Sequence, residues 1–224
     1  MIFFRKTISA QLHFIGCIAA IIGMFVLQQQ VSQLHSANHF LACLIYGTSS
    51  ILVFAVSAIY HFLHDGFTLS KKWAERMEII DHFAIYFFIA GSYTIIILNA
   101  VKSPWSRILL VTVWTFAAVG VIYTLLKPRL PLWAQHRFFY TGLFVGMGWL
   151  MFVRIGEIIA NLNQRHLLVA FILGGASYSF GAILYATKWP KLFEKVFGFH
   201  EIWHIMVIGG YCFHFYVISK FYSA

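Results

Sequence analysis

Long apolar runs alternate with short polar connections along the whole chain, and this pattern predicts the fold. Seven runs reach the roughly 20 residues that a helix needs to cross a bilayer, at residues 8–27, 40–60, 78–98, 105–126, 138–156, 167–187 and 200–220. The first run is too long for a signal peptide, and Gln28, Gln29 and Gln30 follow it in place of a small-residue cleavage site. We therefore expect an all-α polytopic membrane protein, with residues 1–224 forming one domain of seven transmembrane helices.

Composition supports this prediction. Hydrophobic residues make up 61% of the chain and charged residues only 10%, which excludes an ordinary soluble domain. The connections are too short to hold a soluble domain. Two glycine-rich segments, GLFVGMG (142–148) and LGGASYSFGA (173–182), are typical of surfaces where membrane helices pack closely.

The net charge of +9 could indicate a nucleic-acid partner, but the placement of the charges argues against one. Eleven of the sixteen Lys and Arg residues fall on one side of the expected spans: Arg5, Lys6, Lys71, Lys72, Arg76, Lys127, Arg129, Arg137, Lys188, Lys191 and Lys195. The positive-inside rule then puts the N-terminus in the cytoplasm and the C-terminus outside. Anionic lipid headgroups are the expected counter-charge, and no nucleic-acid partner is expected.

Ionisable residues collect at the cytoplasmic ends of three expected spans. The second span ends at His61, the third begins with Asp81 and His82, and the seventh begins with His200 and His204. Alternating topology brings all of them to one depth in the membrane. Such residues are costly at membrane depth and are therefore candidates for a functional site.

Their spacing suits a metal. His200 and His204 are four residues apart and share a helix face, as do Ser57 and His61. Three imidazoles leave a fourth position open, as a catalytic zinc site requires, and zinc lowers the pKa of a bound water toward neutrality. Asp81 could orient that water and act as general base, and Ser57 could donate a hydrogen bond to the substrate carbonyl or to the water.

Simpler interpretations stand beside this one. Histidines in membrane helices also form interhelical hydrogen bonds, and Ser57 could be a packing residue. His82 points roughly 100° away from Asp81 on the helix, which indicates either a structural role or a role in supporting the site residues without binding the metal. His64 is an alternative ligand to His61. The remaining histidines have no such neighbours, and most of them are expected near the interfaces: His13, His35, His39, His136, His166 and His214.

Four segments resemble the progestin and adiponectin receptor-like family, which includes the bacterial hemolysin III group. They are SAIYH (57–61), IDHFAIYFFIAGSYT (80–94), SYSFGAILYATKWP (177–190) and FHEIWHIMVIGG (199–210). One departure is Ile95, where the family commonly has proline after the threonine. Size and predicted orientation are similar to those of the short bacterial members, which implies a bacterial inner membrane protein.

The resemblance implies a seven-helix bundle with zinc near the cytoplasmic face. His61, His200 and His204 match the ligand positions, Asp81 the residue that holds the zinc-bound water, and Ser57 lies nearby in the motif. The family belongs to a wider group of membrane hydrolases that includes alkaline ceramidases. This implies hydrolysis of an amide or ester in a lipid-like substrate, with membrane lipids as the partners.

Other functions stay open. The protein could be a sensor of membrane composition with a structural zinc, which would need a fourth ligand, such as Asp81 bound without a water. A hemolysin-like membrane-active protein is another alternative, although no residue pattern supports a pore. Haem could use histidines from two helices but needs neither the carboxylate nor the serine. A transporter usually shows inverted repeats or broken helices near the midplane, and the sequence shows no clear repeat.

Overall fold

The computed structural model describes residues 8–67, 70–102, 104–162, 164–193 and 197–223, and the described chain is almost entirely helical. Its elements are α2 (Ile8–Ser32), α3 (Ala37–Gly66), α4 (Lys71–Ala100), α5 (Trp105–Leu126), η1 (Lys127–Arg129), α6 (Leu132–Gln135), α7 (Arg137–Trp149), η2 (Leu150–Arg154), α8 (Ile155–Asn161), α9 (Arg165–Thr187) and α10 (Phe199–Lys220). No named strand forms in the described ranges, which hold one isolated bridge between Phe193 and Phe197.

The prediction of seven membrane-spanning helices is confirmed. Within the described ranges, seven helical segments are long and apolar enough to cross a membrane. Several extend past the predicted apolar runs. Helix α4 begins at Lys71 rather than near residue 78, because the segment KKWAERM consists mostly of strong helix formers. Arg5, Lys6 and Lys195, which contributed to the charge count, lie outside the described residues.

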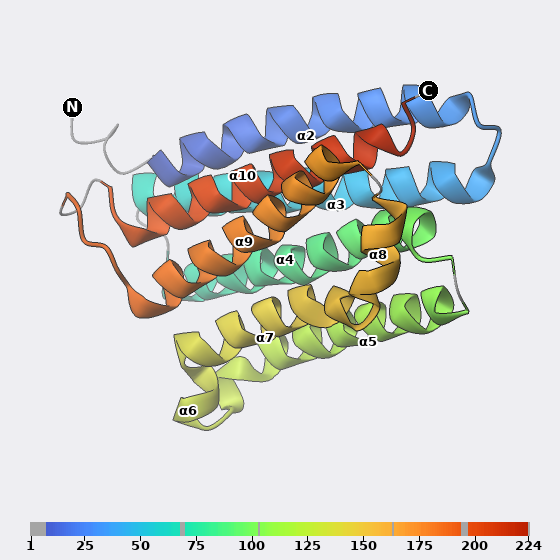
Figure 1. Ribbon diagram of the computed structural model, residues 1–224. Coiled ribbons are helices and arrows are strands. Elements are labelled where there is room, and N and C mark those ends of the chain that lie inside the picture. Colours follow the sequence, from blue (N-terminus) through green and yellow to red (C-terminus); the bar gives the residue numbers. More distant parts are fainter. Residues whose placement is uncertain (1–7, 68–69, 103, 163, 194–196, 224) are drawn as a thin grey trace.

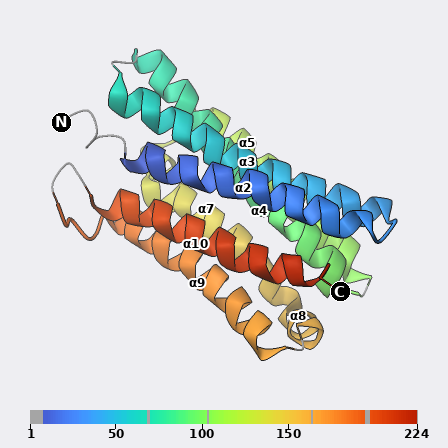
Figure 2. The ribbon, with the colours of Figure 1, turned by 90° about the horizontal axis from the view of Figure 1, so that it is seen from above.

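The helices form a bundle in which α4 is the most enclosed element (Figures 1 and 2). Helix α2 packs against α3 and α10, α9 packs against α10 and α7, and α4 lies against α3, α5 and α7. Helices α2, α4 and α10 begin at one end of the bundle, where α3 also ends (Figure 1). We call this the histidine end, because His61 lies near the end of α3 and His200 and His204 lie near the start of α10. We call the opposite end the far end.

The fifth span is not the continuous helix that the sequence predicts over 138–156. It consists of α7, the 3₁₀ segment η2 and α8. Tyr93 of α4 explains the break: its hydroxyl lies 3.0 Å from the Met147 carbonyl oxygen and 2.8 Å from that of Gly148, and it accepts the Met151 N–H at 2.8 Å. A side chain that inserts into the hydrogen-bond ladder of a helix interrupts that helix. The span therefore bends where α4 contacts it.

Only one of the two glycine-rich segments is a close-packing surface. A Cβ atom on Gly181 would lie 2.7 Å from Met206 Cβ of α10, so this glycine lets α9 and α10 approach. In contrast, a Cβ atom on Gly142, Gly146 or Gly148 would meet nothing within 4 Å. The prediction of close packing for 142–148 is wrong, and these glycines of α7 face open space.

Candidate metal centre

The first turn of α10 is fixed by Glu201. Its Oε2 accepts the backbone N–H of Gly198 at 2.8 Å, which satisfies one of the free N–H groups at the helix start. Its Oε1 accepts the Ser9 hydroxyl of α2 at 3.0 Å. The carboxylate therefore ties α2 to α10 beside His200.

His61, His200 and His204 meet at the histidine end. The Nε2 atoms of His61 and His200 are 3.3 Å apart, and the ring centroids of His61 and His204 are 4.9 Å apart. One ligand atom from each of the three residues lies within 4.8 Å of the others. This geometry brings α3 and α10 together around one point, and the group could hold a metal ion.

The chemistry of these side chains fits a metal. His204 is only 3% exposed, and neither of its ring nitrogens has a hydrogen-bond partner among the described residues. Burying polar atoms without partners is costly, and the ring nitrogens of His204 are therefore available to a ligand. Neutral imidazole nitrogens are good ligands for zinc, and also for copper, iron and nickel.

The two other predicted site residues lie beside this group. The Asp81 carboxylate of α4 lies beside the Ser57 hydroxyl and near the His61 ring. Ser57 is buried and Asp81 half-buried, and both line the same cavity as the three histidines. Five residues from three helices, all named from the sequence, are therefore brought together.

His13 was missed. The expectation that it has no such neighbours is wrong, because its ring centroid lies 4.0 Å from that of His204, at an interplanar angle of 83°. It is buried, and both its ring nitrogens lack a hydrogen-bond partner in the described part of the chain. The one signal in the sequence was its depth: a histidine in the first turns of span 1 lies at the level of the others.

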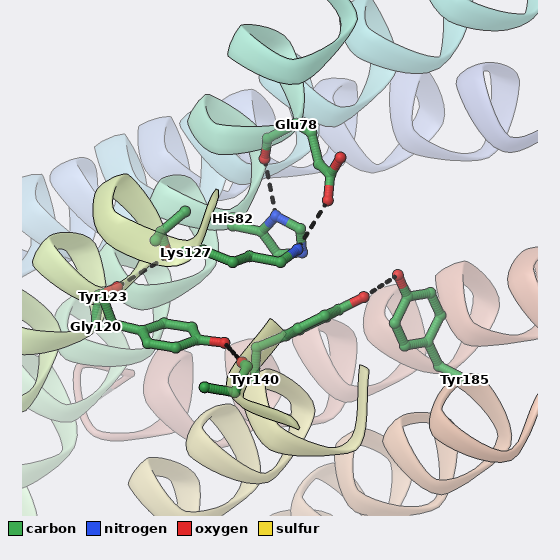
Figure 3. Close-up of polar contacts among 9 residues, drawn as sticks. Glu78, His82, Gly120, Tyr123, Lys127, Tyr140 and Tyr185 are labelled. Carbon is green, nitrogen blue, oxygen red and sulfur yellow. Dashed lines mark hydrogen bonds and ion pairs between the residues drawn. The ribbon is translucent and has the colours of Figure 1, made fainter. Parts of the chain in front are cut away.

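The remaining polar residues of this end are paired differently. The His82 Nδ1 donates to the Glu78 carbonyl oxygen at 2.9 Å, and the Glu78 side chain pairs with Lys127 at 3.1 Å (Figure 3). His82 also packs against Tyr140 and Phe144, which agrees with a structural role. His64 is exposed, its ring lies tilted against that of Tyr60, and it is not part of the three-histidine group.

A cavity of about 800 Å³ extends from the histidines into the bundle. Its acidic and basic residues and most of its histidines lie at the histidine end, whereas its remainder is mostly apolar, with side chains such as Phe88, Ile96 and Phe144 and a few polar ones such as Ser92 and His214. Trp149, Phe152 and Ile172 line it as well and are at least half exposed on the surface of the bundle. The cavity therefore reaches the surface between α7–η2 and α9.

Comparison with protein families decides the identity of this bundle. A family model described as "Haemolysin-III related" matches residues 2–215. The chain belongs to the haemolysin-III related family. As a member, with seven helices long and apolar enough to span a bilayer, it is an integral membrane protein.

The chain is similar to proteins of bacilli and of mammals. The chain is 33% identical to Hemolysin-3 of Bacillus cereus, over 94% of this chain and 90% of that protein. It is 32% identical to a Hemolysin-3 homolog of Bacillus subtilis (strain 168), over 94% and 93% of the two chains. Identity to the human Monocyte to macrophage differentiation factor is 24%, over 79% of this chain and 68% of that protein. The resemblance noted in the sequence is thus confirmed.

Proposed function

We propose that the protein is a zinc-dependent hydrolase that cleaves an amide or ester bond in a lipid-like substrate. The observation that carries this proposal is the position of the three imidazoles, with Asp81 and Ser57 beside them, in the wall of a largely apolar cavity. Three protein ligands leave a coordination position open, as catalytic zinc sites do.

Each side chain has a defined task in this proposal. His61, His200 and His204 would hold the zinc, which would supply a Lewis acid and hydroxide near neutral pH. Asp81 would accept a proton during attack on the substrate carbonyl and return it to the leaving group. Ser57, within reach of Asp81, would orient that carboxylate or donate a hydrogen bond to the substrate.

The cavity supports a lipid-like substrate. Its apolar length would bury acyl chains, and its opening toward Trp149, Phe152 and Ile172 would admit a molecule from the surrounding bilayer. A polar scissile bond at the histidine end and apolar chains along the rest would match the two parts of its lining.

Orientation follows from charge. Described basic residues of the predicted cytoplasmic side, among them Lys71, Lys127 and Lys188, belong to the connections at the histidine end. The positive-inside rule would place this end and the metal centre at the cytoplasmic leaflet. With two bacterial relatives at more than 30% identity, we propose the bacterial inner membrane as its location.

Purified protein tests the proposal directly. Zinc-loaded protein in neutral detergent would be incubated with a panel of lipid amides and esters, and products would be followed by mass spectrometry. The Asp81→Asn variant, with zinc content measured on the same sample, is the matched control. Product that forms with the wild type and not with Asp81→Asn at equal zinc supports the hydrolase. No product from any substrate while zinc is bound contradicts it.

A structural zinc in a membrane sensor is a second candidate, and His13 is the observation that favours it. His13 lies outside the three-histidine group, but its imidazole packs on His204, and a shift of its ring could add a fourth ligand; closed sites with four protein ligands are structural. X-ray absorption of the zinc-loaded protein would separate the two. Three imidazoles and one water or hydroxide bound to the zinc support the hydrolase, whereas four bound imidazoles support the sensor.

A further inference from the structure

One cation lines the cavity beside the metal centre. Arg137, the first residue of α7, is the only Lys or Arg among the described residues that line the cavity. Its Nη1 donates to the Tyr185 carbonyl oxygen at 3.0 Å, and its guanidinium carbon lies 4.4 Å from the Tyr185 ring centroid and 5.4 Å from that of Phe199. A backbone carbonyl and two aromatic rings therefore hold this side chain in place.

No carboxylate of the described chain neutralises this guanidinium. Three acids line the cavity, and each has another partner. Glu78 pairs with Lys127, as Figure 3 shows, Glu201 accepts from Gly198 and Ser9, and Asp81 lies beside Ser57. A guanidinium with N–H donors left over, at the wall of a cavity, is well suited to a planar or tetrahedral anion.

The hydroxyls of Tyr140 and Tyr185 lie close to the Arg137 side chain. The Tyr140 and Tyr185 oxygens are 3.3 Å apart and face each other across the space between α7 and α9 (Figure 3). This distance is longer than an ordinary O–H···O bond, so either hydroxyl could turn to donate to a third group. The Lys127 ammonium lies 4.4 Å above the Tyr140 ring but pairs with Glu78, so this ion pair adds no net charge and Arg137 supplies the positive charge of the cluster.

This cluster adjoins the metal centre. The Tyr185 ring centroid is 5.7 Å from that of His200, so a single aromatic side chain separates Arg137 from a proposed zinc ligand. We propose that Arg137, with the hydroxyls of Tyr140 and Tyr185, binds an anionic group, phosphate or carboxylate, of the molecule that occupies the cavity. This inference rests on the proposed function only in assigning the cavity to a lipid-like molecule.

The substrate class becomes more specific as a result. A lipid that carries its negative charge close to the scissile bond would place the charge at Arg137 and the bond at the three histidines. A neutral diglyceride-like molecule would leave the guanidinium without an anion. We therefore expect acidic lipids to be preferred to neutral ones of the same chain length.

Binding can be measured without hydrolysis by using ether-linked probes, which contain no bond that a hydrolase of this kind cleaves. The probes are a dioctyl ether phosphatidate, the matching dioctyl ether diglyceride without the phosphate, and inorganic phosphate alone. Quenching of tryptophan fluorescence in neutral detergent reports binding, because Trp149 and Trp203 line the cavity. The variants are Arg137→Gln, Arg137→Lys and the control Arg129→Gln, which removes one exposed arginine from the same connection.

We expect the wild type to bind the ether phosphatidate at least about tenfold more tightly than the diglyceride, the effect of about one charge-assisted hydrogen bond. Arg137→Gln should abolish this preference, Arg137→Lys should keep part of it, and Arg129→Gln should keep all of it. Competition by millimolar inorganic phosphate assigns the site to free phosphate, and no competition assigns it to a lipid headgroup.

Equal affinity of the wild type for the two ether lipids overturns the proposal without any variant, so a poorly folded Arg137→Gln protein does not leave it undecided. Equal losses in Arg137→Gln and Arg129→Gln also overturn it, because they would reflect surface charge alone. Hydrolysis plays no part in this readout. A phosphatidate preference in a protein that cleaves no lipid would retain the anion site and reject the hydrolase.

Discussion

Two polar clusters lie at opposite ends of the bundle, and they differ in whether their hydrogen bonds are satisfied. At the far end, the Asn99 amide donates to the Tyr222 hydroxyl oxygen at 2.6 Å, and His39 Nδ1 lies 3.1 Å from the same oxygen. At the histidine end, His13 and His204 bury all four of their ring nitrogens without a partner among the described residues.

This difference indicates that the far-end cluster holds helices together and that the histidine cluster is suited to a ligand. The far-end cluster links α3, α4 and the end of the chain after α10 through neutral hydrogen bonds, and it needs nothing further. The histidine cluster is stable only at a cost, since buried polar atoms without partners destabilise a fold. Such a cost is expected where a ligand completes the site. Substitutions at the histidine end should therefore lower the metal content, whereas substitutions at the far end should lower the stability and leave the metal content unchanged.

The largest effect is expected from the proposed ligands. His61→Ala and His204→Ala should each lower bound zinc from about one per chain to a background level, because two imidazoles hold zinc far less tightly than three. Metal content of the purified proteins by mass spectrometry tests this. His39→Ala, a histidine replaced at the far end, is the control and should keep its metal. Equal zinc in the wild type and the three variants would mean that His61 and His204 are not its ligands.

The second-largest effect is expected from removal of the Asp81 carboxylate. Asp81→Asn keeps the size of the side chain and loses the proton acceptor, so hydrolysis should fall by about 10²–10⁴-fold while zinc is retained. Ser57→Ala should cost less, because its hydroxyl only orients or donates. Rates for the two variants on one lipid amide, normalised to zinc content, give the order. A larger loss in Ser57→Ala would reverse the roles proposed here.

His13 should have an intermediate effect. Because its ring packs on His204 and orients it, His13→Ala should weaken zinc binding by about 10–100-fold, as loss of supporting residues around metal ligands does. Competition with a chelator of known affinity measures this constant. His39→Ala again serves as the control. Unchanged affinity would show that His13 neither supports nor supplies a ligand.

The smallest effect is expected at the far end. Tyr222→Phe removes the oxygen shared by Asn99 and His39 and should lower stability by about 1 kcal/mol without changing zinc content. Thermal unfolding in detergent, with and without a chelator, measures the change. A drop in zinc content for this variant would contradict the separation of the two clusters.

Sequence patterns were sufficient for the helices and for most of the candidate site. Apolar runs of bilayer length leave helix as the available structure for a single segment surrounded by lipid, since each backbone group must be satisfied within it. Alternation of direction then put His61, Asp81 and the pair His200 and His204 at one end. This argument needs only the order of the spans and the depth of each residue, both of which are local properties.

The features that the sequence did not predict depend on which helices pack against one another. The depth of His13 could be counted from the sequence, but its contact with His204 exists only because α2 packs against α10. The break after Trp149 follows from Tyr93 of another helix, and the aromatic setting of Arg137 follows from the approach of α7 to α9. Apolar periodicity shows that a helix spans the membrane, whereas helix neighbours are chosen by packing between residues far apart in the chain.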